Sequence, residues 1–162
     1  MKIKENDSLP ESTLFEYENQ TINSFNVISE TAGKKIILLG VPGAFTPTCS
    51  EKHLPEFLEH ADDFFKKGVD EIWCLSVNDP FVMYAWGLVV KSTKKIRMIS
   101  DGNAEFTKKI GLSEDLSKIG LGIRSNRYGM IINDGVASAV FIEDDPGKFE
   151  NSKVKSILAK LN

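Results

Sequence analysis

Short apolar runs alternate along the chain with longer segments whose apolar residues recur at helical spacing. Residues 35–41 form an apolar run that stops at Pro42-Gly43, which predicts a buried strand. In residues 48–67 the apolar positions recur at i, i+3, i+4 and i+7, which predicts a helix that Gly68 ends. Residues 70–77 form the next apolar run, so the three segments predict a β-α-β unit with parallel strands.

The rest of the pattern predicts further helices, one strand and a hairpin. Asn78-Asp79-Pro80 supplies a capping residue and a proline at the first helical position, and Asn133-Asp134-Gly135 is a strong hairpin signal. The predicted elements are a helix over 80–90, a strand over 96–100, a helix over 103–110, a hairpin of 127–132 and 136–142, and an amphipathic helix over 152–161. This order predicts an α/β protein with a thioredoxin-like fold: a mixed central sheet flanked by helices, then a C-terminal antiparallel hairpin and helix.

Composition narrows the class of protein. The chain has 162 residues, 41% of them hydrophobic and 27% charged, and no repeat or composition break, so we expect a single domain over 1–162. A net charge of −3 without basic stretches excludes nucleic acid as an expected partner. The apolar runs are too short to cross a membrane and the N-terminal residues lack a signal-peptide pattern, so we expect a cytoplasmic protein.

The segment from Val41 to Cys49 carries the most informative chemistry. It joins a buried parallel strand to a long helix, at the carboxyl end of the strand where α/β sheets place their sites. Cys49 falls in the first helical turn, where unpaired N–H groups and the helix dipole favour a thiolate. Pro55 removes one helical N–H and predicts a kink one turn further on.

The two cysteines are too few for a disulfide scaffold, which leaves free thiols, a metal pair or redox catalysts. Cys49 is either a reactive thiolate or an inert buried thiol. Cys74 lies in mid-strand, and we favour a structural role for it over that of a resolving cysteine. His53, four residues after Cys49, could serve as a base or a metal ligand, but we favour a histidine at the site margin with a polar partner. We predict no metal and no cofactor.

Several strings in this sequence resemble one known family. Pro42-x-x-x-Thr46-x-x-Cys49 resembles the peroxiredoxin signature. Residues 40–50 with His53-Leu54-Pro55, together with residues 75–82 and 124–128, resemble the atypical type II (type five) subgroup. The strings agree in order and spacing, and the resemblance runs from about residue 3 to residue 162.

The resemblance implies a cofactor-free, homodimeric, thiol-dependent peroxidase that reduces hydrogen peroxide and organic hydroperoxides. Cys49 resembles the peroxidatic cysteine, which becomes a sulfenic acid, and Thr46 the hydroxyl that binds both sulfur and peroxide. Pro42 resembles the residue that shields the thiolate, and Arg127 the guanidinium beside it. Arg124 either joins Arg127 in the site or forms a supporting ion pair.

Residues 143–162 contain no resolving cysteine, so the resemblance implies an external reductant, either glutathione with glutaredoxin or thioredoxin. Two other functions are compatible with the predicted fold: a thioredoxin-type disulfide oxidoreductase and a non-catalytic binding or chaperone module. Threonine at position 46, where Cys-x-x-Cys needs a cysteine, argues against the first, and the complete set of site residues argues against the second. We also expect a solvated turn at 143–147, and a subunit contact on any face of helix 80–90 that packing leaves exposed.

Overall fold

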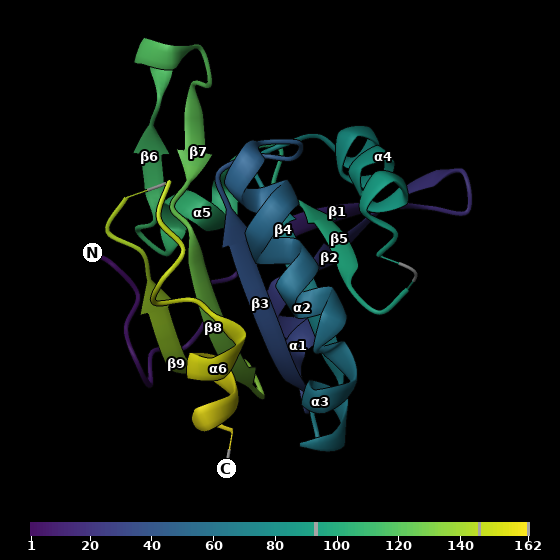
Figure 1. The fold of residues 1–162 in the computed structure, drawn as a ribbon, viewed down its shortest axis with the longest axis vertical. Coiled ribbons are helices and arrows are strands. Elements are labelled where there is room, and N and C mark those ends of the chain that lie inside the picture. Colours follow the sequence, from purple (N-terminus) through teal and green to yellow (C-terminus); the bar gives the residue numbers. More distant parts are fainter. Residues whose placement is uncertain (93, 146, 162) are drawn as a thin grey trace.

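The chain folds around a seven-stranded sheet. The computed structural model describes residues 1–92, 94–145 and 147–161. The strands of this sheet, in spatial order, are β2 (Thr21–Asn26), β1 (Thr13–Glu18), β5 (Arg97–Ser100), β4 (Glu71–Ser76), β3 (Lys35–Val41), β8 (Tyr128–Asn133) and β9 (Val136–Ile142). Of these strands, β9, β8 and β3 are seen side by side in Figure 1. Strands β3, β4 and β5 are parallel, whereas β1, β8 and their outer neighbours pair antiparallel. The sheet is therefore mixed, as predicted.

Helices cover both faces of the sheet. One face carries η1 (Cys49–His53), α2 (Leu54–Glu59), α3 (Ala61–Lys66), α4 (Pro80–Val90) and α6 (Val154–Ala159). The other face carries α1 (Val27–Thr31) and α5 (Glu105–Lys109). A small hairpin of β6 (Ser113–Asp115), the single turn η2 (Ser117–Ile119) and β7 (Ile123–Ser125) projects from the end of the sheet (Figure 1).

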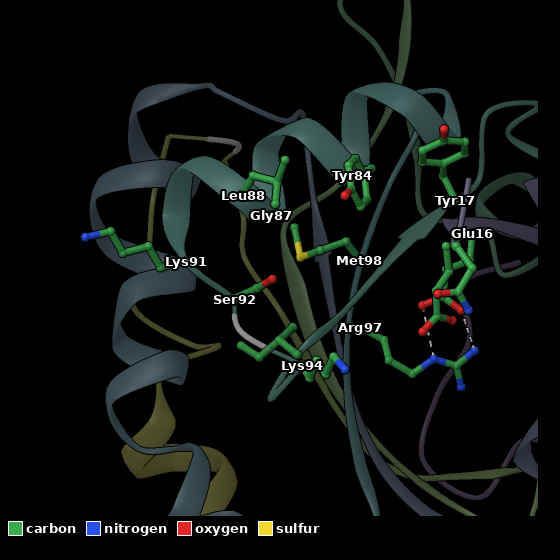
Figure 2. Close-up of a pocket in the computed structure, with 13 residues that line it drawn as sticks. Glu16, Tyr17, Tyr84, Gly87, Leu88, Lys91, Ser92, Lys94, Arg97 and Met98 are labelled. Atoms are coloured by element: carbon green, nitrogen blue, oxygen red, sulfur yellow. Dashed lines mark hydrogen bonds and ion pairs between the residues drawn. The ribbon is translucent and has the colours of Figure 1, made fainter. Parts of the chain in front are cut away.

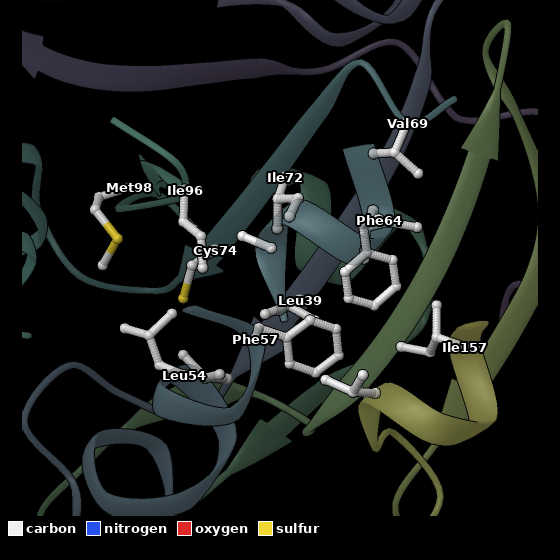
Figure 3. Close-up of a cluster of buried hydrophobic side chains, with 14 of the residues drawn as sticks. Leu39, Leu54, Phe57, Phe64, Val69, Ile72, Cys74, Ile96, Met98 and Ile157 are labelled. Atoms are coloured by element: carbon white, nitrogen blue, oxygen red, sulfur yellow. The ribbon is translucent and has the colours of Figure 1, made fainter. Parts of the chain in front are cut away.

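Each face of the sheet builds its own hydrophobic core. Alternate residues of β3 point to opposite sides, so Ile37, Leu39 and Val41 join one cluster while Ile36 and Leu38 join the other. Figure 3 shows the first cluster, in which Phe57 and Phe64 from the helices meet residues of the sheet. The continuous apolar run in β3 is explained by this burial on both faces.

Most of the predicted elements are confirmed with small differences at their ends. The strand over 35–41 and the helix over 80–90 have the predicted bounds, and the predicted hairpin turns at Asp134 and Gly135, both with positive φ. The Asp79 carboxylate accepts a hydrogen bond from the Val82 N–H at 2.9 Å, which is the predicted cap of α4. The thioredoxin-like fold class is thereby confirmed.

The predicted helix over 48–67 is present, but it departs from regular α-helical geometry at two places. Its first turn, η1, is π-helical, with the Leu54 N–H bonded to the Cys49 carbonyl, and Pro55 follows directly. The helix breaks again at His60, whose φ of −103° and ψ of 11° separate α2 from α3. Proline has no N–H to give to the Glu51 carbonyl, so the predicted kink takes the form of a wider turn that contains the cysteine.

The hairpin β1–β2 and helix α1 were not predicted. β2 is an edge strand with largely exposed residues, so it lacks the apolar alternation that marks a half-buried strand. In the part of the chain that the structure describes, none of the helices has both the length and the apolar character that crossing a membrane requires.

Candidate active site

The loop after β3 is fixed to the neighbouring parallel strand. β3 and β4 end side by side, with Val41 opposite Ser76. The Asn78 side-chain oxygen, just beyond β4, accepts hydrogen bonds from the Ala44 N–H at 2.9 Å and the Ser76 hydroxyl at 2.6 Å. The loop that carries the predicted chemistry is thus attached at the carboxyl edge of the sheet, as the sequence predicted.

The Cys49 sulfur receives two hydrogen bonds from residues that are far apart in the sequence. The Thr46 hydroxyl lies 2.9 Å from the sulfur, and Nη2 of Arg127 lies 3.0 Å from it. Arg127 directly precedes β8, and β8 pairs antiparallel with β3, so the guanidinium returns to the end of β3. The structure therefore brings together Cys49, Thr46 and Arg127, which the sequence analysis had singled out.

The Thr46 hydroxyl has a choice of acceptor. It lies 2.8 Å from the Gly43 carbonyl oxygen as well as 2.9 Å from the sulfur, and a hydroxyl has a single proton to donate. When Cys49 is a thiol, the S–H can donate to Oγ1 while the hydroxyl donates to Gly43. When Cys49 is a thiolate, the hydroxyl can turn its proton to the sulfur without moving its oxygen.

His53 lies behind Arg127. Its Nδ1 is 3.1 Å from Nη1 of Arg127, and the ring is fully buried between Phe57 and Phe149, with centroids 5.5 and 4.7 Å away. Burial and the neighbouring Arg127 charge lower the pKa of His53 from 6.5 to about 3, against a weaker opposing interaction with the Ser152 backbone. His53 is therefore a neutral acceptor, and its Nδ1 lone pair is directed at arginine rather than at the cysteine.

Arg124 and Pro42 lie on the other side of the loop. Nη1 of Arg124 is 3.4 Å from the Pro42 carbonyl oxygen, and Nε is 2.8 Å from the Leu121 carbonyl oxygen. The guanidinium also covers Gly43, where an added Cβ would come within 2.8 Å of Nη1. Arg124 thus binds the backbone of the loop and not the sulfur, and Pro42 is buried beneath it.

Cys74 belongs to the core. It pairs with Leu39 and Met98 of the adjacent strands and points into the cluster near Leu54 (Figure 3). Burial raises its pKa well above the ordinary value, and the nearby Cys49 adds to this shift. Both cysteines are free, and Cys74 is an un-ionised, buried thiol in this state.

Two contacts around the site had no clear signal in the sequence. The Trp86 indole N–H donates to the Ser50 hydroxyl at 3.0 Å and so ties η1 to α4. Glu143, expected in a solvated turn, is buried and accepts from the Ser152 N–H, the Ser152 hydroxyl and the Glu150 N–H at 2.7–2.9 Å. That expectation was wrong for Glu143, although Asp144 and Asp145 are exposed; position 146 lies outside the described residues.

The sulfur is enclosed in this structure. Cys49 has no exposed surface, whereas Phe45 in the preceding loop is 50% exposed. A small molecule therefore needs some movement of the residues around the sulfur in order to reach it. A separate cavity of about 590 Å³ lies between β1, α4 and β5. Figure 2 shows residues that line it, and Cys49 is not among them. The described residues contain no cluster of histidine, cysteine or carboxylate side chains suited to a metal ion.

Comparisons with known proteins show the family and the fold of the chain. The model of the Redoxin family matches residues 4–158. Peroxiredoxin-2B of Arabidopsis thaliana is 46% identical over 156 residues, which cover 96% of this chain and 96% of that protein. The crystal structure of reduced Prx3 from Vibrio vulnificus in complex with hydrogen peroxide has a TM-score of 0.93 and 45% identity, with 99% of both chains covered. A Burkholderia cenocepacia structure provisionally named a thioredoxin reductase has a TM-score of 0.95 and 46% identity, and covers 100% of this chain and 99% of that one.

Fold and site together define a thiol-based oxidoreductase of the Redoxin class. The chain belongs to the peroxiredoxin family within that class, and it is a thiol peroxidase.

Proposed function

We propose that this peroxiredoxin reduces hydrogen peroxide and small organic hydroperoxides through Cys49 and is recycled by an external thiol. The observation that carries the proposal is the double hydrogen bonding of the Cys49 sulfur by Thr46 and Arg127, at 2.9 and 3.0 Å. The Vibrio vulnificus relative, with a TM-score of 0.93, was crystallised in complex with hydrogen peroxide, which supports peroxide as the substrate. The similarity to Peroxiredoxin-2B and to peroxiredoxin 5 of Alvinella pompejana supports the type II subgroup.

The first chemical step is a displacement at oxygen. The thiolate attacks the terminal oxygen of R–O–O–H, an S–O bond forms, and the O–O bond breaks with its electron pair on the leaving RO⁻. Cys49 becomes a sulfenic acid, and RO⁻ takes up a proton to leave as alcohol or water. Sulfur is oxidised by two electrons and the peroxide is reduced by two, so the step requires no cofactor.

The hydrogen-bond donors around the sulfur contribute more to the rate of peroxide reduction than ionisation of the thiol does. A free thiol of pKa ~8.5 is a few per cent ionised at pH 7, so full ionisation gains only about 30-fold. Negative charge grows on the leaving oxygen as the O–O bond stretches, and donors fixed around that position stabilise the transition state more than the ground state. We assign this role to Thr46 and Arg127, and we assign to Pro42 the exclusion of water from the sulfur.

The second half of the cycle uses a thiol from outside the chain. The sulfenic acid condenses with a thiol R′–SH to form a mixed disulfide and water, and a second thiol releases Cys49 as R′–S–S–R′ forms. Cys74 is a poor candidate for the first thiol because it is buried in mid-strand with a raised pKa. Glutathione with glutaredoxin, or thioredoxin, would supply the reducing equivalents.

Two cysteine variants test the proposal. With hydrogen peroxide and either reducing system, we expect Cys49→Ser to lose turnover and Cys74→Ser to keep most of it. Retained turnover in Cys49→Ser would overturn the proposed chemistry. A fall of Cys74→Ser to a single turnover would instead make Cys74 the resolving cysteine. Reduction of insulin disulfides by the unmodified protein would favour the rival disulfide oxidoreductase function.

We further propose a homodimer in a reducing compartment such as the cytoplasm. One face of α4 exposes a row of large apolar side chains: Phe81, Tyr84, Leu88 and Val89 are 55%, 43%, 64% and 66% exposed. Such a patch is typical of a protein contact. Sedimentation of the unmodified chain and of Leu88→Asp tests the dimer, which the aspartate should dissociate. The compartment is supported by the two free thiols and by the need for a thiol reductant.

A further inference from the structure

We propose that His53 is a positioning residue that holds the Arg127 guanidinium in line with the Cys49 sulfur. This inference rests on the proposed function of Cys49 and adds a residue to it. Nη2 of Arg127 lies 3.0 Å from the sulfur while Nη1 lies 3.1 Å from Nδ1 of His53. Because the guanidinium is planar and rigid, a partner at each of these two nitrogens restricts its rotation in that plane.

The arrangement requires an uncharged imidazole. Nδ1 can accept from arginine only while it carries no proton, and a protonated ring would repel the guanidinium. The charged group that faces the ring is Arg127, with Cys49 beyond it, while Phe57, Phe149 and the Ser152 backbone complete its surroundings. This apolar enclosure keeps the ring neutral throughout the ordinary pH range of an enzyme, so the acceptor is always available.

The position of Phe149 depends on the segment from Glu143 to Ser152. The buried Glu143 carboxylate binds both the backbone N–H and the hydroxyl of Ser152, and the Glu143 N–H donates to the Arg127 carbonyl at 2.9 Å. The same short segment thus fixes the backbone of Arg127 and closes the ring of His53 away from water. Because this segment is bonded to Arg127, the residues that enclose the His53 ring belong to the site rather than to a separate part of the core.

A purely structural role explains this histidine poorly. The other ring nitrogen, Nε2, is buried and forms no hydrogen bond of ordinary geometry with the described residues. The interaction of the ring with the Ser152 backbone is too weak to add much to the stability of the fold, so an apolar residue among these aromatic rings would serve the packing equally well. The hydrogen bond to Arg127 is the feature that an apolar residue could not supply.

Two nearly isosteric substitutions separate the hydrogen bond from the packing. In His53→Asn the side-chain oxygen occupies the position of Nδ1 and can still accept from Nη1, whereas His53→Leu has a similar shape and no acceptor. We expect His53→Asn to reduce peroxide within about threefold of the unmodified rate constant and His53→Leu to lose about tenfold or more. Thiolate absorbance at 240 nm and pH 7 should fall in His53→Leu and persist in His53→Asn. His60→Leu, which removes an exposed histidine from the same segment, should leave both readouts unchanged.

The outcomes distinguish this inference from the function on which it rests. Equal rate constants and equal thiolate absorbance in the two His53 variants would overturn the positioning role. If the unmodified protein consumed no peroxide, the proposed function would fail, yet the thiolate absorbance of the two variants would still show whether His53 orders Arg127. Thermal unfolding at pH 7 verifies that both variants are folded, and a loss of activity that followed stability alone would also overturn the proposal.

Discussion

At the scale of single residues, Thr46 is the group whose hydrogen bond changes with the state of the sulfur. Its hydroxyl is shared between the Gly43 carbonyl and Cys49. We expect Thr46→Val, which keeps the shape and removes the hydroxyl, to lower the rate constant for peroxide reduction by about 100-fold, the typical effect of one transition-state donor. Thr46→Ser retains the hydroxyl and should stay within about tenfold. Stopped-flow measurement of peroxide consumption compares them, and an unchanged rate in Thr46→Val would contradict the role assigned to this hydroxyl.

His53 should also affect how the free energy of unfolding depends on pH. Its pKa is about 3 in the folded protein and near 6.5 in the unfolded chain, so between these values the unfolded chain binds the extra proton. The free energy of unfolding should therefore fall on acidification below pH 6.5, by up to about 1.4 kcal/mol per pH unit, and this contribution should be constant above pH 7. Urea unfolding at pH 7, 6 and 5 measures the fall, which should be smaller in His53→Asn.

The window from pH 6.5 to 5 separates the titration of His53 from that of Glu71. Hydrogen bonds from Lys34, Trp73 and Arg97 outweigh burial and lower the pKa of Glu71 to about 2, so its stabilisation is lost only as the pH falls below about 4.5. An identical slope in the unmodified protein and His53→Asn between pH 6.5 and 5 would mean that His53 is not kept neutral.

The sequence allowed the residues of the site to be predicted more fully than their contacts. Cys49 could be proposed from its place at a helix start, while Thr46 and Arg127 followed from the resemblance to the peroxiredoxin family. The contact between His53 and Arg127 joins positions 74 residues apart. The position of His53 four residues after Cys49 does not indicate that its ring points toward Arg127. Arg124 takes neither of the two roles expected for it, because its partners are backbone carbonyls, which leave no pattern in a sequence.

At the scale of elements, the pairing of β3 with β8 brings Arg127 to the site and depends on a glycine. Gly40 lies opposite Tyr128, and a Cβ at Gly40 would overlap the buried Tyr128 ring. We expect Gly40→Ala to destabilise the protein by about 2–3 kcal/mol and to slow peroxide reduction, because the displaced ring adjoins Arg127. Urea unfolding and the peroxide rate constant measure the two effects. The double variant Gly40→Ala/Tyr128→Leu makes room for the methyl, so failure to recover stability there would contradict the steric explanation.

Elements with strong local signals were predicted well, and those shaped by their surroundings were not. β3 and α4 combine apolar runs with Pro-Gly and Asp-Pro boundaries, so both bounds could be read from the sequence. The π-helical turn over 49–53 results from a proline six residues after the cysteine, and nothing local distinguishes this from a simple kink.

At the scale of the whole molecule, Arg97 joins the N-terminal hairpin to the parallel strands. Its guanidinium lies 2.8 Å from Glu16 of β1, 2.8 Å from Glu30 of α1 and 2.6 Å from Glu71 of β4. We expect Arg97→Met to cost about 2–4 kcal/mol of unfolding free energy, since three carboxylates would lose their shared partner. Urea unfolding at low and high salt measures this, and salt should recover part of the loss. Lys95→Met removes an exposed ion pair with Asp62 and should change stability by less than about 1 kcal/mol.

The cluster of ion pairs around Arg97 helps to explain why β1 and β2 were not predicted. β1 and β2 are held by a short turn with positive φ at Asn19 and Gln20 and by ion pairs with distant residues, rather than by a regular apolar pattern. The strands of the central β-α-β unit, in contrast, are continuous apolar runs, from which their burial could be predicted. The fold class could therefore be predicted from its centre while one edge of the sheet could not.

The bond between Trp86 and Ser50 gives the site an intrinsic optical reporter. The indole is buried, its N–H is held by the residue after Cys49, and the Phe45 ring of the covering loop lies 6.4 Å away. Because Ser50 belongs to η1, an unwinding of η1 would move the hydroxyl away from the indole and change the surroundings of the ring. The only other tryptophan, Trp73, lies in β4, so Trp73→Phe would leave a single fluorophore whose emission follows the opening of the site in real time.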